Sequence, residues 1–243
     1  MNKPWMRWLL WIQVGLLVVL LLSMLANKFA LVEFKLAFLT FYKAIQVVIL
    51  VSALGLVGLI VAWWRKQTAS IRPALFTVLL GLAPVLMVLA IVGQGLKVPA
   101  IHNITTDLQN PPEFVLAYEN RAEGLNSLDA PSDAVRDMQR DYYPQLGSLT
   151  LAHTPAQSFE LALAACKGLG LEVTHSDQST GHIEAIEETL FFGFKDDVVI
   201  RVMPVEAGSQ IDLRSVSRVG RSDLGANAKR IERILAAIKS SAQ

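Results

Sequence analysis

The sequence of 243 residues contains a single cysteine, Cys166. One cysteine excludes an intramolecular disulfide and any metal site built from several cysteines. The sequence also lacks the glycine-rich nucleotide and phosphate loops, the Gly-x-Ser-x-Gly elbow and the His-Glu-x-x-His zinc motif. The histidines show no ligand spacing and are His102, His153, His175 and His182. We therefore expect no cofactor and no metal, and we favour a role other than catalysis.

Acidic residues are nearly absent from positions 1–96, where Glu33 is the only one. These positions carry a net charge of +7, whereas positions 97–200 carry −10 and positions 201–243 carry +4. Three stretches of the first part have no charge, and each has about the 20 residues that a helix needs to cross a membrane. They are residues 8–26, 44–64 and 73–96. Because a helix satisfies its own backbone hydrogen bonds in lipid, 1–96 is predicted to be a transmembrane region of three helices.

The charges that flank these stretches predict their orientation. Five basic residues lie on the N-terminal side of the membrane, namely Lys3, Arg7, Arg65, Lys66 and Arg72. The opposite side carries three over a longer loop, namely Lys28, Lys35 and Lys43. Because positive loops remain in the cytoplasm, the N-terminus is expected there and the C-terminal domain outside. We predict a multi-pass protein of a bacterial inner membrane with a periplasmic domain.

Two further features of the membrane region bear on its role. Met24 stands where cleavage after Ala26 would need a small residue, so the first stretch is expected to be retained rather than removed as a signal peptide. The apolar residues 27–43 either lie in the membrane interface or extend the second span. No ionisable residue lies deep in a span, so the sequence indicates anchoring rather than transport.

The remaining residues are typical of a folded polar domain. Residues 97–150 are rich in proline and turn formers and are expected to form an extended arm and loops, with a short helix at 133–140. Residues 151–243 have the pattern of an α+β domain in the order α-β-β-β-β-α. The expected elements are a helix at 154–168, strands at 171–177, 181–190, 196–205 and 210–219, and a helix at 222–239. Short links between strands predict an antiparallel four-stranded sheet with two helices on one face, the other face being open or covered by the arm.

The last two strands suggest a register. A four-residue loop, 206–209, would pair Val205 with Gln210 and place Arg201 opposite Arg214. One sheet face is then apolar and the other charged. Two facing arginines need a carboxylate or a bound anion between them, and Glu184 and Asp212 are the candidate carboxylates.

Three segments together resemble a bacterial domain family of unknown function that is also seen in plastid proteins. They are Ile101–Asp107 with the following Pro111-Pro112, Phe194–Arg201, and the motif Arg214-Ser-Val-Ser-Arg-Val-Gly-Arg-Ser-Asp-Leu-Gly-Ala-Asn227. The resemblance covers about residues 97–243 closely and implies the form of the family that carries a membrane anchor. The chain departs from the family pattern at Asn103, where an aspartate is expected. The resemblance assigns no catalytic residue.

The segment Arg218–Asn227 is the strongest candidate site, because free amides at a helix start and neighbouring arginines favour an anion. The alternative is that these arginines pair with Asp197, Asp223 or the acidic loop and serve the fold. The candidate ligand-binding residues are Arg201, Asp212, Arg214, Arg218, Arg221, Ser222, Asp223 and Asn227, with His102 and Asp107 in the arm. His102 and Asp107 are expected to fix the arm rather than to form an acid–base pair.

Three functions are compatible with these patterns. The first is a membrane-anchored protein whose domain binds an anionic ligand or partner of the cell envelope. The second is an envelope hydrolase or transferase that uses residues 102–107 and the arginine face. The third is an accessory subunit of a membrane complex. The expected partners are the lipid bilayer and an anionic ligand or membrane protein, and the acidic domain argues against nucleic acid.

Overall fold

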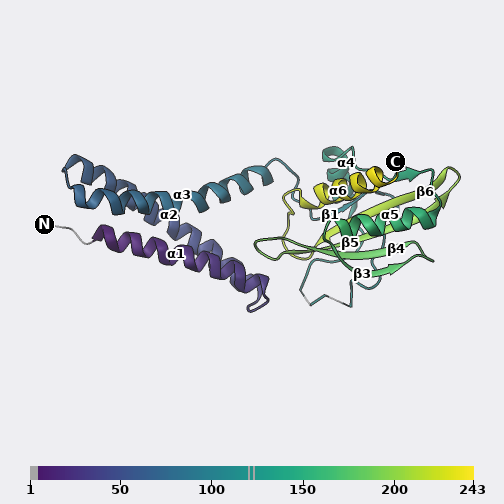
Figure 1. Ribbon diagram of the computed structural model, residues 1–243, viewed down its shortest axis with the longest axis horizontal. Helices are drawn as coiled ribbons and strands as arrows, with labels where there is room; N and C mark the ends of the chain where they lie inside the picture. The colour runs from purple at the N-terminus through teal and green to yellow at the C-terminus, as the bar shows by residue number, and fades with distance from the viewer. Residues whose placement is uncertain (1–4, 120, 123) are drawn as a thin grey trace. The chain divides into compact units, whose positions relative to one another are not determined.

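The computed structural model describes residues 5–119, 121–122 and 124–243, which form two compact units (Figure 1). The first unit holds the described residues up to Gly93 together with Leu190–Gly193. The second unit holds Gln94–Thr189 and Phe194–Gln243. The segment 97–150 therefore belongs to the same compact unit as the strands and helices that follow it.

The first unit contains three helices, each long and apolar enough to cross a membrane, as the sequence predicted. They are α1 (Trp5–Lys28), α2 (Phe34–Trp64) and α3 (Thr68–Gly95). Of the residues 27–43, Phe34–Lys43 form the beginning of α2. At 1.5 Å per residue the 31 residues of α2 extend over about 46 Å, so α2 is longer than the hydrocarbon thickness of about 30 Å.

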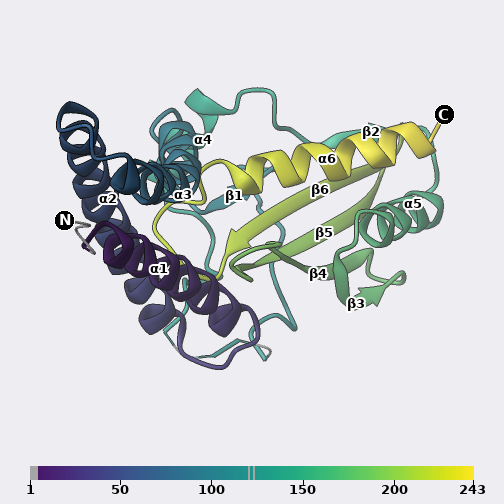
Figure 2. The same ribbon diagram turned by 60° about the vertical axis from the view of Figure 1, so that its left-hand side comes forward.

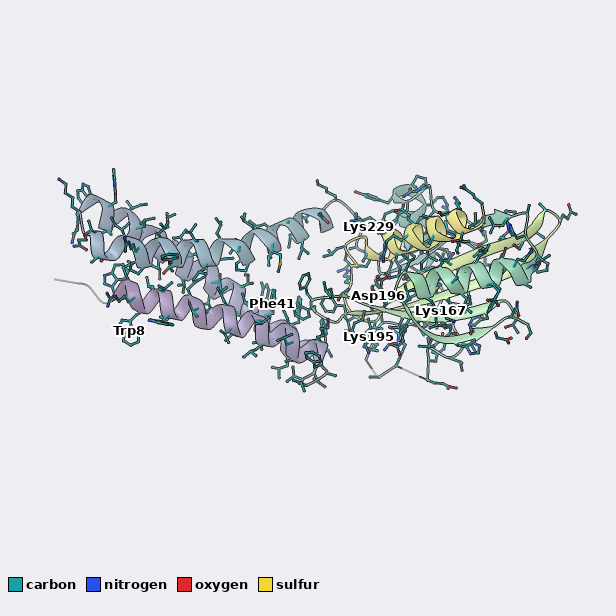
Figure 3. All side chains as sticks on the ribbon, viewed as in Figure 1. Trp8, Phe41, Lys167, Lys195, Asp196 and Lys229 are labelled. Carbon is teal, nitrogen blue, oxygen red and sulfur yellow. The ribbon has the colours of Figure 1, made fainter. Side chains whose placement is uncertain are left out.

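Small residues allow these helices to approach closely. A Cβ atom added at Gly58 of α2 would lie 1.8 Å from Met6 Cε of α1, and one added at Gly81 of α3 would lie 1.8 Å from Ser52 Oγ of α2. Large apolar side chains such as Trp8, which is 66% exposed, point outward instead (Figure 3). Small residues at close helix contacts are typical of helices packed in lipid. Larger side chains, namely Leu20, Ile45 and Val48, are also buried in this unit.

The second unit is an α+β domain with antiparallel strands, as predicted, but its sheet has six strands rather than four, and its elements follow the order β-α-β-α-β-β-β-β-α rather than α-β-β-β-β-α. The strands follow the order β1-β6-β5-β4-β3, and β2 also pairs with β6. The two additional strands have three residues each, too few to show a pattern of alternation in the sequence. The elements are β1 (Asn103–Thr105), α4 (Asp133–Tyr142), β2 (Leu149–Leu151), α5 (Pro155–Gly168), β3 (Glu172–Asp177), β4 (His182–Glu188), β5 (Lys195–Val205), β6 (Gly208–Ser217) and α6 (Ala226–Ser241).

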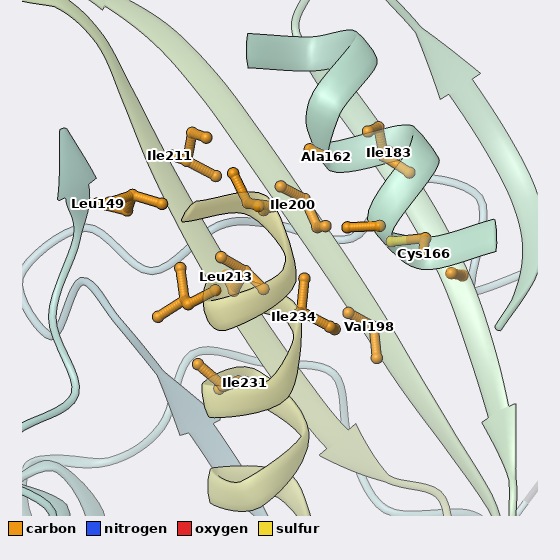
Figure 4. Packing of buried hydrophobic residues seen from close by; sticks show 14 of the residues in the cluster. Leu149, Ala162, Cys166, Ile183, Val198, Ile200, Ile211, Leu213, Ile231 and Ile234 are labelled. Atoms are coloured by element: carbon orange, nitrogen blue, oxygen red, sulfur yellow. The ribbon is translucent and has the colours of Figure 1, made fainter. Parts of the chain in front are cut away.

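Helices α5 and α6 cover one face of this sheet (Figure 2). Thr154 begins α5 with a reciprocal capping box that involves Gln157. Between the helices and the sheet lies the main core, shown in Figure 4, to which Ile200 and Leu213 contribute from the strands and Ile231 from α6. Cys166 is fully buried here, and burial raises the pKa of its thiol to about 12. The lone cysteine is therefore a small core residue.

The predicted register of the last hairpin is wrong by two residues. The loop consists of Glu206 and Ala207, so Val205 pairs with Gly208 and Arg201 lies opposite Asp212 rather than Arg214. A shift of two residues leaves every side chain on its predicted face. One face is mainly apolar, although Asp196 pairs there with Arg230 of α6, and the other carries most of the charges. The observed register replaces a repulsive pair of arginines with a pair of opposite charge.

The arm covers the charged face of the sheet. Phe114, Ala117 and Leu128 form a second apolar cluster with Val199 of β5 and Val216 of β6. In α4, the buried Gln139 accepts a hydrogen bond from Thr105 N at 3.0 Å and donates one to Thr105 O at 2.6 Å. The side-chain amide of Gln139 therefore connects α4 to β1. Together with the apolar cluster, it attaches the arm to the sheet although the arm has few regular elements.

Candidate functional site

A cavity of about 960 Å³ lies between the charged sheet face and the arm. His175, His182, Arg201 and Arg214 reach it from four neighbouring strands. The arm contributes apolar and charged groups, among them Glu113, Phe114, Tyr118, Leu128, Asp129 and Arg136. A cavity of this size suits a small-molecule ligand, and its lining offers an apolar wall beside fixed charges.

The strand register explains why charged groups gather here. Asp177 of β3 pairs with His182 of β4, His182 with Arg201 of β5, and Arg201 with Asp212 of β6. Residues that pair directly across strands point to the same face. Four chemically active side chains therefore form one row across the sheet, and three of them line the cavity.

His182 and Glu184 form a hydrogen-bonded dyad at the cavity. His182 Nε2 lies 2.9 Å from Glu184 Oε1, and the ring of His175 lies 5.9 Å from that of His182. The carboxylate of Glu184 also accepts hydrogen bonds from the backbone N–H groups of Val115, Leu116 and Ala117 in the arm. Burial tends to raise the pKa of Glu184, but the hydrogen bonds from His182 and the arm outweigh it and lower the pKa. Glu184 is thus an ionised group that orients His182 and holds the arm.

Arg201 is held between two carboxylates. Its Nη2 lies 3.0 Å from Asp107 Oδ2 and 3.1 Å from Asp212 Oδ2. Asp212 also accepts hydrogen bonds from the hydroxyl groups of Thr106 and Ser148 and from the amide of Gln210. The Nε atom of Arg201 is buried and has no hydrogen-bond partner among the described residues. Among the described residues, one donor of this guanidinium is therefore left without an acceptor.

Arg214 also borders the cavity, but the fold already uses its donors. The side chain is buried and donates to Asn103 Oδ1 at 3.0 Å, Pro112 O at 3.2 Å and Leu128 O at 2.9 Å, and also to Asp129 O. Its guanidinium carbon lies 5.3 Å from the centroid of the Phe114 ring. Burial lowers the pKa of Arg214 to about 10. Through these hydrogen bonds, Arg214 holds the arm against the sheet.

The segment Arg218–Asn227, predicted as the strongest site, makes contacts within the domain. Arg218 pairs with Asp197 at 2.7 Å, and Asp223 accepts from the N–H groups of Gly225 and Asn227. Burial raises the pKa of Asp223 more than these hydrogen bonds lower it. Ser222 Oγ accepts a hydrogen bond from Leu224 N. The side chain of Asn227 accepts a hydrogen bond from Ser215 Oγ and donates to Ser217 Oγ and His102 O. Arg221 is exposed. None of these predicted residues is among the described lining of the cavity, and their role as ligand-binding residues stays a prediction.

The arm residues His102 and Asp107 lie on either side of β1 and make different contacts. His102 Nδ1 lies 3.4 Å from Arg221 O, beside the helix start, whereas Asp107 pairs with Arg201 at the cavity. Asp107 Oδ1 also accepts from the backbone of Gln109 and Asn110. The contacts of the described residues do not join His102 to Asp107, and each contact fixes the arm. Asn103 accepts a hydrogen bond from Arg214.

The sequence reasoning missed His175 and His182 because it searched for ligand spacing along the chain. Both side chains lie on the same sheet face as Glu184, because His175 pairs with Glu184 and His182 is two residues before it in β4. Glu184 is one of the two carboxylates that the sequence places on the charged face. Extending the pairing by one strand would have placed both imidazoles there. No group of three or more potential metal ligands lies together within the described parts of the chain, and the absence of a metal stays a prediction.

Comparison with known proteins identifies the domain. A family model described as "Protein of unknown function (DUF1499)" matches residues 103–238, which is more than half of the chain. The matched residues include both the cavity and the Arg218–Asn227 segment. A search of curated proteins gives no match.

Proposed function

The chain belongs to the DUF1499 family, and from this premise we propose that its second unit binds an anionic ligand of the cell envelope in the cavity beneath the arm. The observation that carries the proposal is the row across the sheet, in which Arg201 pairs with His182 across the strands and its buried Nε has no hydrogen-bond partner among the described residues. Its place on the periplasmic side of a bacterial inner membrane follows from the proposed topology, which the distribution of basic residues supports.

The cavity lining suggests the chemistry of this ligand. The charged groups of the lining are Arg136, Arg201 and Arg214 with Glu113, Asp129 and Asp177. Behind them, Asp107 and Asp212 contact Arg201, and Glu184 contacts His182. Phe114, Tyr118 and Leu128 form an apolar wall. A ligand with an anionic head that the arginines hold and an apolar part that contacts this wall fits the lining.

The hydrolase or transferase is the second candidate, and one observation favours it. His182 is held by the ionised Glu184 at 2.9 Å, the arrangement in which a carboxylate orients an imidazole to take up a proton. In the enzyme hypothesis, His182 and Glu184 take the acid–base role for which the sequence suggested His102 and Asp107. Arg201 would then hold the anionic part of the substrate beside the base. The accessory subunit stays a third candidate, to be tested by copurification from detergent.

Native mass spectrometry of the full chain, extracted from its membrane, tests the binding proposal. The wild-type protein should retain an anionic adduct, and Arg201→Ala should lose it. Arg140→Ala is the matched control, because Arg140 is an exposed arginine of α4 that pairs with Asp137 outside the cavity. Retention of the adduct by Arg201→Ala would refute binding at this cavity. A C-terminal alkaline phosphatase fusion tests the orientation, and an inactive fusion would contradict a periplasmic domain.

A further inference from the structure

The loop between β4 and β5 is unusually apolar for a connection in a charged domain. Its sequence Thr189-Leu-Phe-Phe-Gly-Phe194 carries four large apolar side chains in six positions. Leu190 is 73% exposed and Phe191 is 67% exposed. Single exposed apolar residues are common, but two adjacent ones at the tip of a loop mark a surface that contacts something else.

The backbone of this loop is well defined. Thr189 N donates to Phe194 O at 2.8 Å, and Phe194 N donates to Thr189 Oγ1 at 2.8 Å. Gly193 has φ +67, a conformation that L side chains rarely adopt. These contacts close the loop at its base, and residues 190–192 form its tip.

The tip is grouped with the helices of the first unit. The Phe192 ring lies 5.4 Å from that of Phe41 and 6.2 Å from that of Phe38, both in the first turns of α2. Asn27, in the last turn of α1, donates to Phe192 O at 2.6 Å. A Cβ atom added at Gly193 would lie 2.7 Å from Lys28 Cα, so this position also requires glycine for space.

These neighbours belong to the ends of two helices that can cross a membrane. Lys28 is the last residue of α1, and its Nζ donates to Leu190 O. Lys28, Lys35 and Lys43 supply positive charge around this end, and Phe29 and Phe34 add aromatic rings. Basic and aromatic residues at helix ends are characteristic of the boundary between lipid headgroups and hydrocarbon.

We propose that Leu190 and Phe191 insert into this boundary region of the bilayer and serve as an anchor of the loop in the lipid. Their partner is the membrane of the chain's own helices, with anionic headgroups favoured by the lysines. The inference is independent of the anion-binding cavity. A protein partner could also cover an apolar tip, but the contacts of Phe192 and Gly193 with the helix ends favour lipid.

The test uses the full chain in vesicles of phosphatidylethanolamine and phosphatidylglycerol, with an NBD fluorophore attached to Phe191→Cys. Ala207→Cys, in the exposed turn between β5 and β6, is the matched control. Wild-type protein is the labelling blank, because Cys166 is buried. At position 191 we expect blue-shifted emission, quenching by lipids with a nitroxide near the headgroup and loss of quenching by iodide. The label at position 207 should behave in the opposite way.

Two outcomes would overturn the proposal. Iodide quenching at position 191 equal to that at position 207 would place the tip in water. Protection from both iodide and the nitroxide lipids would show that protein covers the tip. As a further check, Leu190→Ser combined with Phe191→Ser should abolish protection of a label at position 192 (Phe192→Cys), while the exposure of the label at 207 stays the same.

Discussion

Removal of the Glu184 carboxylate should release the arm from the sheet. Glu184 is buried in β4 and is the common acceptor for three consecutive backbone N–H groups of the arm, at Val115, Leu116 and Ala117. Alanine at this position leaves those donors and His182 without their acceptor. Because the arm forms one wall of the cavity, its release should also open the cavity.

The size of the effect follows from these contacts. A hydrogen bond to a charged group contributes about 1.5 kcal/mol or more, and a buried donor that loses its acceptor costs a similar amount. Val115 is exposed, so its N–H can reach water, whereas Ala117 is buried. Counting the bonds of Leu116 and Ala117 only, Glu184→Ala should lower the free energy of unfolding by roughly 3 kcal/mol.

The sign of the pH dependence follows from the lowered pKa of Glu184. A carboxyl group with a lower pKa in the folded state stabilises the fold above its unfolded pKa, and this contribution is lost as the pH falls through the folded pKa. The difference between wild type and Glu184→Ala should therefore be fully present at neutral pH. It should shrink in acid, below the ordinary range of glutamate.

Hydrogen exchange followed by mass spectrometry is the direct assay. In Glu184→Ala, amides 115–117 should exchange faster, while the core strand β5 keeps its protection. The matched control is Glu188→Ala, an exposed glutamate of the same strand that pairs with Lys195 at 3.8 Å. Unchanged exchange at 115–117 in Glu184→Ala, or an equal effect of Glu188→Ala, would refute the role assigned to Glu184.

Three other predictions concern different parts of the chain. Arg214→Met should destabilise the second unit by about 3 kcal/mol or more in thermal unfolding, because four acceptors of the arm lose a buried donor, and a change below 1 kcal/mol would contradict this. Cys166 should react with a maleimide only under denaturing conditions, since its thiol is buried and its pKa is about 12; labelling of the native protein would contradict this. Gly81→Leu should loosen the helix unit in detergent, because the first added carbon already lies 1.8 Å from Ser52 Oγ, whereas Gly93→Leu, which has open space, should not.

The sequence predicted the parts of the fold that have long and regular patterns. Three uncharged stretches indicated three helices, and the alternation in β5 and β6 assigned side chains to the correct faces even though the register was wrong by two residues. The register failed because the length of the turn decides it, and the segment 206–209 allowed a loop of two or of four residues. The strands β1 and β2 were missed because their pairing depends on tertiary contacts, such as the clamp of Gln139 on Thr105.

The candidate site was predicted in part. The charged face and Arg201 could be identified from alternation, whereas the histidines required the pairing of β3 with β4. The arginines could not be ranked from sequence, because Arg201 and Arg214 lie on the same face of adjacent strands. Only the three-dimensional contacts distinguish them, since Arg214 donates to four groups of the arm, whereas the buried Nε of Arg201 has no partner in the described parts of the chain.

Ligand retention in two arginine variants tests the central claim most directly, namely that the cavity rather than the helix start binds the anion. Arg201 lines the cavity, and Arg221 is the exposed arginine of the Arg218–Asn227 segment. In native mass spectra of the full chain, Arg201→Ala should lose the anionic adduct and Arg221→Ala should keep it at the wild-type level. Loss of the adduct from Arg221→Ala with retention by Arg201→Ala would place the site at the helix start and contradict the claim.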